Sequence, residues 1–334
     1  MNEGGLGAGD RPVERVAVAL CTRDGEQHLP AQLASILSGS RLPDEVVIVD
    51  DASADRTMEI VAAFADSARE RGVAVVIEQN PAALGVAANF ERAIRMSTAD
   101  IVMLCDQDDV WHEDRVAAVH AAYESEPGLL FLHGDAVIVD DVGDPDGTTL
   151  FGRLEVTARE RSEVTAGRAF PVYLRRNLAT GATSSFRRSL LDDALPFSQL
   201  WLHDEWLAII AAARESIRID GSPRIDYRIH GRNQVGAARP TLRNKVSRVT
   251  GADAERNVVL AVRARELAER LDVRGLPAAA AAAMAKAEFE SARAELPRIR
   301  IGRIPRILGW LVGGDYRRWA SRGRWDAVRD LLRR

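Results

Sequence analysis

Four short apolar runs at the start of the chain predict the strands of a parallel sheet. They cover residues 16–21, 45–50, 73–78 and 101–105, and each is bounded by polar turns. Runs that are apolar almost throughout are typical of strands buried on both faces. Their starts lie about one strand–helix–strand repeat apart. We therefore expect a doubly wound α/β unit in the first third of the chain.

Helical patterns fill the segments between these runs. Apolar residues recur at helical spacing in 29–37, 57–68 and 86–96, and Asp55 is expected to cap the second of these helices. The middle of the chain is more mixed. The elements expected there are helices over 114–126, 187–194 and 204–214, strands within 129–139, and turns over 140–149.

The composition shifts at about residue 240, where the chain becomes rich in alanine and charged residues. Two helices are expected there, over 257–271 and 277–296, and they are expected to form a hairpin. The first residues are Gly-rich and acidic, which is typical of a disordered tail. The expected division is therefore a tail over 1–12, an α/β domain over 13–238 and a helical extension over 239–334.

The charge of the chain excludes one class of function and leaves another open. Lys and Arg total 45, Asp and Glu total 49, and the net charge is −4, so a dedicated nucleic-acid binder is excluded. Residues 297–334 nevertheless hold eleven Arg against three Asp. Within them, 299–312 alternates Arg with Ile, Leu and Trp, which fits either an anionic membrane surface or a helix packed on the protein body. Pro305 is expected to interrupt any long helix there.

The cysteine count and the start of the chain predict a cytoplasmic protein. Two cysteines, Cys21 and Cys105, are too few for a disulfide framework. The first residues lack the basic and apolar segments of a secretion signal. No stretch reaches the roughly 18 consecutive apolar residues of a spanning helix. We expect a cytoplasmic location, peripheral on the inner face of the plasma membrane if the basic tail binds lipid.

Carboxylates gather after three of the four expected strands. Asp24 and Glu26 follow the first strand, Asp50 and Asp51 follow the second, and Asp106, Asp108 and Asp109 follow the fourth. The carboxyl ends of parallel strands meet at one edge of a sheet, where ligands bind. Helix capping accounts for Ser53 or Asp55, but the five crowded carboxylates after the second and fourth strands repel one another unless a cation or hydrogen-bond donors compensate.

The cluster after the fourth strand offers oxygen ligands only, which indicates Mg²⁺ or Mn²⁺. Such an ion typically bridges protein carboxylates and a diphosphate. Neither G-x-G-x-x-G nor G-x-x-x-x-G-K-[ST] follows the first strand, so a dinucleotide site and a P-loop are both disfavoured. The predicted ligand is a nucleoside diphosphate held at the strand ends.

Five motifs follow one another in order between residues 13 and 236. They are VAVALCTRDGEQHLPAQLASI, DEVVIVDDASADRT, NPAALGVAANF, DIVMLCDQDDVW, and the later pair HDEW and YRIHGRNQVG. This pattern resembles glycosyltransferase family 2, which has the GT-A fold, and DQDDVW with HDEW is most similar to its rhamnosyltransferase-like branch. The resemblance implies transfer of a sugar, rhamnose from dTDP-rhamnose in that branch, with inversion at the anomeric carbon. The implied acceptor is a hydroxyl of a glycan or lipid-linked molecule in bacterial surface polysaccharide synthesis.

The resemblance also assigns residues to the donor side. The residues that it implies for nucleotide-sugar binding are Thr22, Asp24, Glu26, Asp50, Asp51, Asn89, Asp106, Asp109 and Arg228. Asp108 is the implied main metal ligand, Asp106 is shared between metal and ribose, and His230 is a further ligand or a partner of the leaving pyrophosphate. Arg23 and Asp24 depart from the aromatic residue and Asn that the family carries after the Thr.

The acceptor side needs one general base. Asp204 of the HDEW motif matches the family's base, and Glu205 is the alternative. The competing interpretation is that Asp204 only caps the following helix. Gly181, Trp111 and Trp206 are expected on the acceptor side, the two Trp as walls that stack on a sugar, although a Trp lies more often in a core.

Two other functions compete with glycosyl transfer. A sugar-nucleotidyltransferase would need a Gly-rich loop with basic residues directly after the first strand, and residues 22–25 contain a single Gly. A catalytically silent nucleotide-sugar-binding scaffold would not need the intact acidic motifs. The sequence therefore favours a metal-dependent, inverting glycosyltransferase.

Overall fold

The computed structural model describes residues 13–230 and 254–333. The chain divides into two compact units, residues 1–127 and 128–334. The tail expected over 1–12 and the domain boundary expected between residues 238 and 239 both lie outside the described residues.

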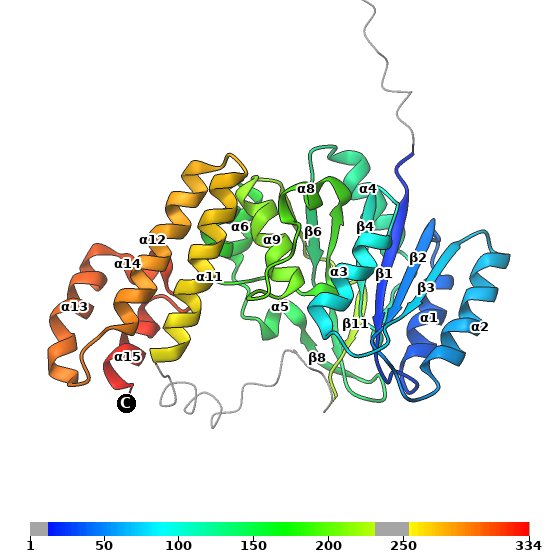
Figure 1. The fold of residues 1–334 in the computed structure, drawn as a ribbon, viewed down its shortest axis with the longest axis horizontal. Coiled ribbons are helices and arrows are strands. Elements are labelled where there is room, and N and C mark those ends of the chain that lie inside the picture. The colour runs from blue at the N-terminus through cyan, green and yellow to red at the C-terminus, as the bar shows by residue number, and fades with distance from the viewer. Residues whose placement is uncertain (1–12, 231–253, 334) are drawn as a thin grey trace, which may run out of the picture. The chain divides into compact units, whose positions relative to one another are not determined.

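The first unit is built on parallel strands in the order β4–β1–β2–β3 (Figure 1). The strands are β1 (Val16–Thr22), β2 (Glu45–Asp50), β3 (Ala74–Gln79) and β4 (Ile101–Cys105). β1, β2 and β4 are buried almost throughout, and only β3 is partly exposed. The four apolar runs are thus confirmed as parallel strands, and their carboxyl ends share one edge of the sheet.

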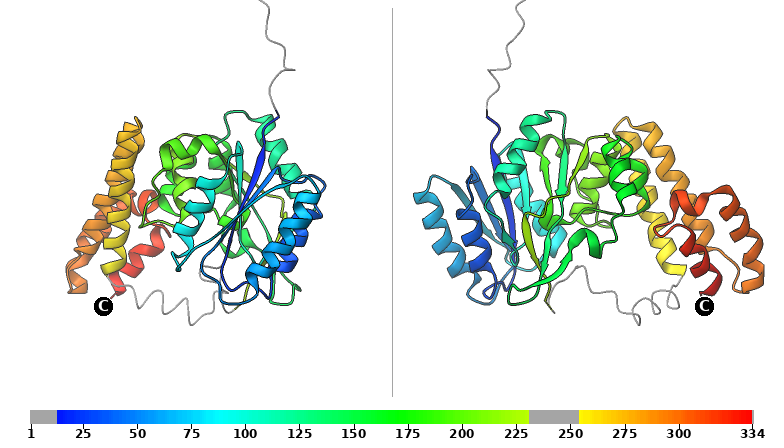
Figure 2. Two further views of the ribbon diagram at one scale, coloured as in Figure 1. Left: turned by 45° about the vertical axis from the view of Figure 1, so that its right-hand side comes forward. Right: turned by 180° about the vertical axis from the view of Figure 1, so that it is seen from behind.

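Helices cover both faces of this sheet, with α3 on one side and α1 and α2 on the other (Figure 2, left). Their bounds are α1 (Leu29–Leu37), α2 (Thr57–Glu70) and α3 (Val86–Met96), which confirms the three predicted linking helices. Each presents an apolar stripe to the strands. The unit closes with β5 (Val110–Trp111) and α4 (Arg115–Ser125).

The second unit contains two small sets of paired strands. β6 (Phe131–Gly134) pairs in parallel with β10 (Ile217–Asp220) and antiparallel with β9 (Ser185–Arg187). β7 (Val137–Val139) pairs in parallel with β11 (Ile225–Arg228) and antiparallel with β8 (Pro145–Thr149). The expected turns over 140–149 are therefore wrong at β8. Its sequence, PDGTT, has poor strand propensity, and backbone pairing with β7 decides its structure.

Short helices surround these strands. They are α5 (Leu150–Arg153), α6 (Ala158–Thr165), α7 (Ala169–Arg175), α8 (Leu191–Ala194) and α9 (His203–Ala213), with 3₁₀ turns at Gly181–Thr183 and Arg188–Leu190. α9 is the core helix of the unit, because nearly every residue along it is buried. Its all-round apolar sequence is the reason: such a helix has no face suited to water.

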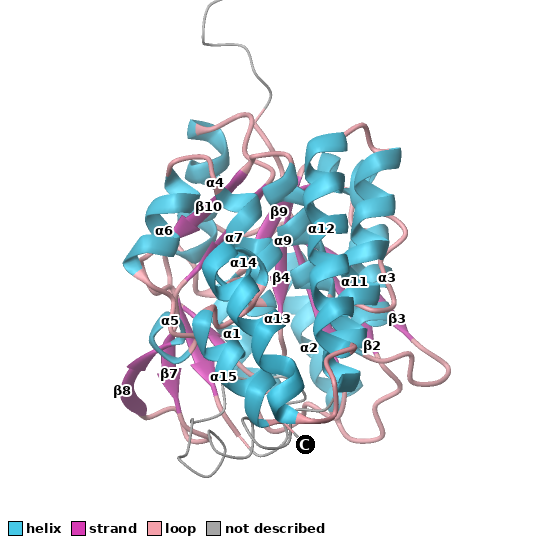
Figure 3. Ribbon diagram, turned by 90° about the vertical axis from the view of Figure 1, so that its left-hand side faces the viewer, coloured by secondary structure: helices cyan, strands magenta, loops and turns pink. Residues whose placement is uncertain are grey.

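The helical extension follows in the described residues from 254 onward. Its elements are α11 (Ala254–Val273), α12 (Pro277–Ala294), α13 (Arg300–Gly313), α14 (Asp315–Trp319) and α15 (Arg324–Leu332). α11 and α12 lie side by side, which confirms the predicted hairpin (Figure 3). Pro305 lies inside α13, so the expected interruption is wrong. The proline lacks one N–H, and the rest of the helix carries on around it.

A buried network of charged side chains ties the extension together. Arg293 of α12 donates to Asp330 of α15 (Nε to Oδ2, 2.7 Å) and to Glu290 (Nη1 to Oε2, 2.8 Å). Tyr316 donates to the same Asp330 carboxylate (2.7 Å), and Lys286 donates to Glu290 (3.1 Å). All five side chains are buried. None of the helices in the described part of the chain is long and apolar enough to cross a membrane.

Candidate functional site

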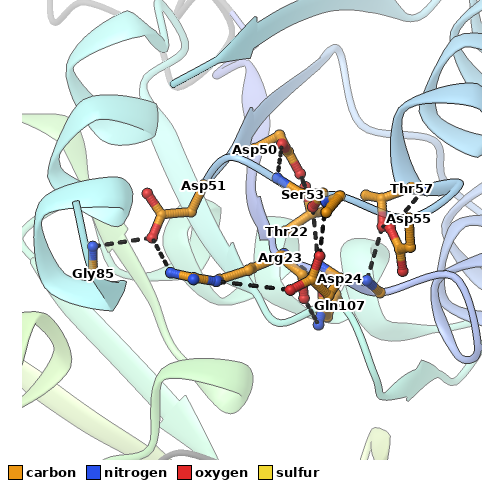
Figure 4. Close-up of polar contacts among 12 residues, drawn as sticks. Thr22, Arg23, Asp24, Asp50, Asp51, Ser53, Asp55, Thr57, Gly85 and Gln107 are labelled. Atoms are coloured by element: carbon orange, nitrogen blue, oxygen red, sulfur yellow. Dashed lines mark hydrogen bonds and ion pairs between the residues drawn. The ribbon is translucent and has the colours of Figure 1, made fainter. Parts of the chain in front are cut away.

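One amide side chain holds the turn after β1 to the turn after β4 (Figure 4). Gln107 Oε1 accepts a hydrogen bond from the Arg23 N–H (2.8 Å), and Gln107 Nε2 donates to the Arg23 carbonyl (2.9 Å). Gly25 lies against the same amide, because a Cβ at that position would come within 2.8 Å of Gln107 Cδ. The sequence analysis missed Gln107, since nothing local links it to a residue 84 positions away.

Asp50 ends β2 fully buried and accepts hydrogen bonds at both carboxylate oxygens (Figure 4). Its donors are the Thr22 hydroxyl (2.8 Å), the Ser53 N–H (2.8 Å), the Ser53 hydroxyl (2.5 Å) and the Gln79 amide (3.1 Å). Four donors occupy the lone pairs of a carboxylate. In the structure the Asp50 oxygens are thus used within the protein, where they hold the buried Thr22 in place, and the expected nucleotide contact of Asp50 stays a prediction.

Asp51 is also buried and is fixed from several sides. It accepts hydrogen bonds from Asn80 Nδ2 (2.9 Å), the Leu84 N–H (2.7 Å) and the Gly85 N–H (3.0 Å), and Arg23 Nη1 lies 3.7 Å from its Oδ2. Burial acts to raise the pKa of Asp51, but these hydrogen bonds and the Arg23 charge outweigh it and lower the pKa below its ordinary value. Asp51 therefore carries a negative charge, and its nucleotide contact stays a prediction.

Asn89, expected on the donor side, lies inside the protein instead. Its Nδ2 donates to the Val49 carbonyl (2.9 Å), and its Oδ1 accepts from Asn80 Nδ2 (2.8 Å). The side chain is almost completely buried. Asn89 thus orients Asn80, which in turn holds Asp51, and the expected donor contact of Asn89 stays a prediction.

Asp24 and Glu26 are the expected nucleotide residues whose side chains reach solvent. Each also binds the turn after β2: Asp24 Oδ1 accepts from the Ala54 N–H (2.9 Å), and Glu26 Oε2 accepts from the Arg56 N–H (3.3 Å). The N-cap of α2 is Arg56, so the expected N-cap position of Asp55 is wrong by one residue, although Asp55 Oδ1 still accepts the Thr57 N–H at the start of the helix (2.9 Å). The turns after β1 and β2 thus form one cross-linked rim.

Negative charge concentrates at the end of β4. Asp109 is buried, whereas Asp106 and Asp108 are partly exposed. Burial raises the pKa of the Cys105 thiol well above its ordinary value, and the charges of these three carboxylates raise it further. In the residues that the structure describes, no three His, Cys, Asp or Glu side chains are grouped to hold a metal ion. Asp106 and Asp108 still suit Mg²⁺ or Mn²⁺, since Mg²⁺ commonly takes one or two carboxylates together with substrate phosphates.

The acidic pair of the HDEW motif opens helix α9 in the second unit. Leu202 is the N-cap, so Asp204 and Glu205 lie within the first turn and the capping interpretation is wrong. Asp204 is 8% exposed, and its Oδ1 accepts the Glu205 N–H (2.8 Å). A carboxylate at this place faces the positive end of the helix dipole.

The pKa of Asp204 suits a general base. Burial raises it to about 6, and hydrogen bonds from the backbone of Glu205, Gly181 and Asp204 itself, with the charge of Arg263, hold it from rising further. A base of this strength is ionised at neutral pH and still takes up a proton readily.

Glu205 differs from its neighbour because its carboxylate is already paired. Arg263 of α11 forms a hydrogen-bonded ion pair with Glu205 Oε2, and its guanidinium lies 4.0 Å from the centre of the Trp201 ring. Burial raises the pKa of Glu205, against the charge of Arg263. The sequence analysis missed Arg263 and Trp201, which 62 residues separate along the chain.

Gly181 lies against the start of α9. A Cβ at this position would stand 3.2 Å from His203 Nε2 and 3.8 Å from the Asp204 Cβ. The first of these distances is tighter than ordinary packing, so the glycine permits the close approach. Gly181 therefore lies next to the candidate base, and its expected place on the acceptor side stays a prediction.

The two tryptophans expected to stack on a sugar lie in the core. Trp206 is fully buried and donates from Nε1 to the Ala194 carbonyl (2.8 Å), and Trp111 is nearly as buried. Their burial favours the competing interpretation, in which both tryptophans are core residues, and the stacking role stays a prediction.

Arg228 and His230 follow at the end of β11. Arg228 is buried, and its Nη1 donates to the carbonyls of Asp140 (3.2 Å) and Asp141 (2.8 Å). These bonds turn at least part of the guanidinium toward the β7–β8 turn. His230 lies two residues further on and is partly exposed. Their contacts with pyrophosphate or metal stay predictions.

Comparisons with known proteins agree with this architecture. Residues 17–193 match the profile of glycosyl transferase family 2. The dTDP-rhamnosyl transferase RfbG of Shigella flexneri is 24% identical over 233 residues, which are 65% of this chain and 74% of that protein. An uncharacterized glycosyltransferase of Nostoc sp. is 20% identical over 119 residues, 36% of each chain.

A solved structure shares the fold. The crystal structure of S. aureus TarS 1–349 in complex with UDP-GlcNAc superposes with a TM-score of 0.54 and 17% identity, covering 95% of this chain and 90% of that one. This likeness confirms the expected GT-A fold. The profile match spans more than half of the sequence and includes both acidic turns. The chain therefore belongs to glycosyl transferase family 2 and is a nucleotide-sugar glycosyltransferase.

Proposed function

We propose that this protein is an inverting, metal-dependent glycosyltransferase with Asp204 as its general base. The observation that carries the proposal is the contrast within the acidic pair: Asp204 is buried with a pKa of about 6, whereas Glu205 is held by Arg263. An inverting displacement needs one base and no protein nucleophile. Asp204 therefore has the state that the reaction requires, and Glu205 is occupied.

The proposed reaction is a single displacement. Asp204 takes the proton of an acceptor hydroxyl, whose oxygen bonds to the anomeric carbon of the donor sugar. The bond from that carbon to the nucleoside diphosphate breaks, and the diphosphate leaves with the electron pair. Attack opposite to the leaving group inverts the anomeric configuration.

Asp108 and Asp106 are the residues that we propose to hold a Mg²⁺ or Mn²⁺ ion. When bound, the ion supplies Lewis-acid stabilisation of the leaving diphosphate. Both carboxylates are partly exposed on the turn after β4, next to the rim that carries Asp24 and Glu26. Because the turn is fixed, the two carboxylates are held in place to bind the ion together with the diphosphate, and further protein ligands are not required.

We further propose dTDP-rhamnose as the donor and a glycan or lipid-linked hydroxyl as the acceptor, in the assembly of a bacterial surface polysaccharide. The support is the similarity to a protein named as a dTDP-rhamnosyl transferase. The proposed location is the cytoplasm, at the inner face of the plasma membrane.

A donor screen with and without Mn²⁺ tests the metal and the donor together. We expect dTDP-rhamnose to raise the melting temperature more than UDP-GlcNAc or GDP-mannose, and only when Mn²⁺ is present. A ligand at about 100 times its Kd stabilises the folded state by about 2.7 kcal/mol. Asp108→Ala should abolish the Mn²⁺-dependent part, because it removes the main proposed ligand.

Asp66→Ala is the matched control, since Asp66 is a solvent-exposed carboxylate on α2 that forms an ion pair with the exposed Arg69. It should leave the donor-dependent shift unchanged. An equal shift in wild type and Asp108→Ala would remove Asp108 from the metal site. An equal response to all three donors would remove rhamnose from the proposal.

The segment 299–312 is proposed to contact an anionic membrane surface. On α13, Ile301, Ile304, Leu308 and Val312 are 78%, 40%, 54% and 89% exposed, although they form one apolar stripe at helical spacing. The buried side of the helix instead carries Arg303, which donates to the carbonyls of residues 330 and 333 (both 2.9 Å). Ile307 and Trp310 of the same helix do pack inward, Trp310 against Phe289, so the alternative of an apolar face packed on the protein stands for them, and the proposal concerns the four exposed residues.

Charge and a second stripe support a lipid surface as the occupant. Arg300 and Arg306 are exposed on the same segment and Arg298 directly before it, and anionic lipid attracts such residues. The neighbouring α15 exposes Trp325 (76%) and also Val328 at helical spacing. Aromatic and aliphatic side chains flanked by Arg are typical of helices that lie in a membrane interface.

A flotation assay of the full chain tests this contact. Wild type should float with vesicles that contain phosphatidylglycerol and stay unbound with phosphatidylcholine alone. Ile301→Asp with Leu308→Asp should reduce binding at least about tenfold, because each buried aliphatic side chain contributes roughly 1.5–3 kcal/mol. Val142→Asp, at an equally exposed valine of the β7–β8 turn, should bind normally. Normal flotation of the double variant would overturn the proposal. So would a wild-type protein that does not float and instead self-associates through these residues, with the double variant monomeric.

A further inference from the structure

Helix α11 of the extension holds the segment that leads into the candidate base. Ser198 donates to Glu266 (2.6 Å), and Arg270 donates to the carbonyls of Ala194 (2.9 Å) and Pro196 (2.9 Å). Residues 263, 266 and 270 recur at helical spacing, so one face of α11 makes all of these contacts. The extension is therefore bound to residues 194–206.

Arg263 is the member of this face that reaches the acidic pair. Its guanidinium is paired with Glu205 and stacked on Trp201, and about a fifth of the side chain is exposed. Trp201 in turn packs on Trp206, with ring centres 5.9 Å apart. The planar guanidinium is thus fixed by an ion pair on one edge and by a ring on one face, and its positive charge, which a lysine would also carry, acts on both carboxylates.

The charged groups around Asp204 come from two helices. On α9 they are Glu205 and His203, and burial lowers the pKa of His203 to about 3, so this ring is neutral near pH 7. On α11 they are Arg263 and Arg270, whose guanidinium lies 5.2 Å from the Trp206 ring centre. Of these groups, Arg263 is the cation that acts on both carboxylates.

We propose that Arg263 is a positioning residue for the Asp204–Glu205 pair, so that the helical extension forms part of the acceptor-side machinery. It occupies Glu205, which leaves Asp204 as the single available base, and its charge keeps Asp204 ionised at neutral pH. The inference depends on the proposed role of Asp204. A guanidinium supplied from 58 residues away makes catalysis depend on the docking of α11.

The pH dependence of turnover separates this role from a structural one. Release of nucleoside diphosphate from dTDP-rhamnose should give a wild-type acid limb in kcat/KM near pH 6, since Asp204 must be ionised to act. Arg263→Gln should move this limb to higher pH by about one unit, because it removes an opposite charge at ion-pair range. The kcat/KM of Arg263→Gln would then be about fivefold below that of wild type at pH 6 and less than about twofold below it at pH 8. Arg263→Lys should restore most of the limb.

A second readout needs no donor. The chain has six Trp, and Trp201→Phe assigns the Trp201 indole signal in a ¹⁵N-Trp spectrum. This signal should titrate with the acidic pair, its midpoint should rise in Arg263→Gln, and Asp204→Asn should remove that transition. Arg265→Gln, at an exposed arginine two positions along α11, should leave both the midpoint and the turnover unchanged.

Two outcomes overturn the inference. An acid limb and an indole midpoint that stay at the wild-type pH in a folded Arg263→Gln protein would show that Arg263 only packs. The same conclusion would follow if Arg263→Lys returned the indole midpoint to its wild-type value but left the acid limb of kcat/KM shifted. Normal turnover in Asp204→Asn would instead overturn the proposed base, whatever Arg263 does, so the two failures are distinguishable.

Discussion

Asp204→Asn should abolish sugar transfer, with kcat lower by about 10²–10⁴-fold and donor binding nearly unchanged. Asparagine keeps the size of the side chain and can still meet the Glu205 N–H, but it cannot accept the acceptor's proton. Most of the residues proposed for the donor lie in the first unit, on the turns after β1, β2 and β4, and Arg228 and His230 lie at the end of β11 in the second unit. Steady-state kinetics together with donor binding by calorimetry would separate the two effects. Any residual activity should lack the acid limb near pH 6.

Asp192→Asn provides the matched control, because Asp192 is an exposed carboxylate on the short helix α8 of the same unit. It should keep full activity. Glu205→Gln should reduce kcat less than Asp204→Asn, since Glu205 is engaged by Arg263. Activity of Asp204→Asn within about threefold of wild type would remove Asp204 from the mechanism. A larger loss in Glu205→Gln would transfer the role to the alternative base.

Arg293→Met should lower the free energy of unfolding by about 3–5 kcal/mol, the cost of removing one partner from a buried ionic network. Arg293 is 1% exposed, and the Glu290 and Asp330 carboxylates that it contacts are equally buried. Methionine fills much of the same space but leaves both carboxylates without their guanidinium. Lys286 and Tyr316 remain as donors, so the network is weakened and not emptied. Urea unfolding followed by circular dichroism measures the change.

Arg298→Met, at an exposed arginine just before α13, should change the free energy of unfolding by no more than about 0.5 kcal/mol. A loss below about 1 kcal/mol in Arg293→Met would mean that the two carboxylates find other partners when the guanidinium is gone. The same network bears on deletion experiments. A chain cut at residue 296 would lose Asp330 and leave Arg293 without one of its carboxylates.

The first unit could be predicted from the sequence because its signals are local. Each strand is a nearly continuous apolar run, and helices α1 and α3 begin and end where their apolar periodicity does. Residues 150–176 were left unassigned, although Thr157 and Glu160 form a capping box at the start of α6. The capping box was the local sequence signal that could have located α6. No local signal marks β8, because its strand structure depends on pairing with β7 in the folded chain.

The candidate site was predicted less completely, because residue type does not tell a ligand from a support. Asp50 and Asn89 have the chemistry of binding residues, yet their polar atoms are used inside the protein. Gln107 and Arg263 work through partners 84 and 58 residues away, and only the folded chain brings them together. Asp204 could be proposed from the sequence because it matches the family's short acidic motif, and its role as the base stays a proposal.

The pair of bonds from Gln107 to the Arg23 peptide imitates the pairing between two strands, with a side-chain amide in place of a backbone. The turn after β1 and the turn after β4 are therefore mechanically one body, although the chain places about 80 residues between them. Gly25 leaves room for this bridge, so a side chain there would wedge the two turns apart. If the turn after β1 binds the nucleotide and the turn after β4 binds the diphosphate, Gln107 would keep the distance between the two binding turns constant.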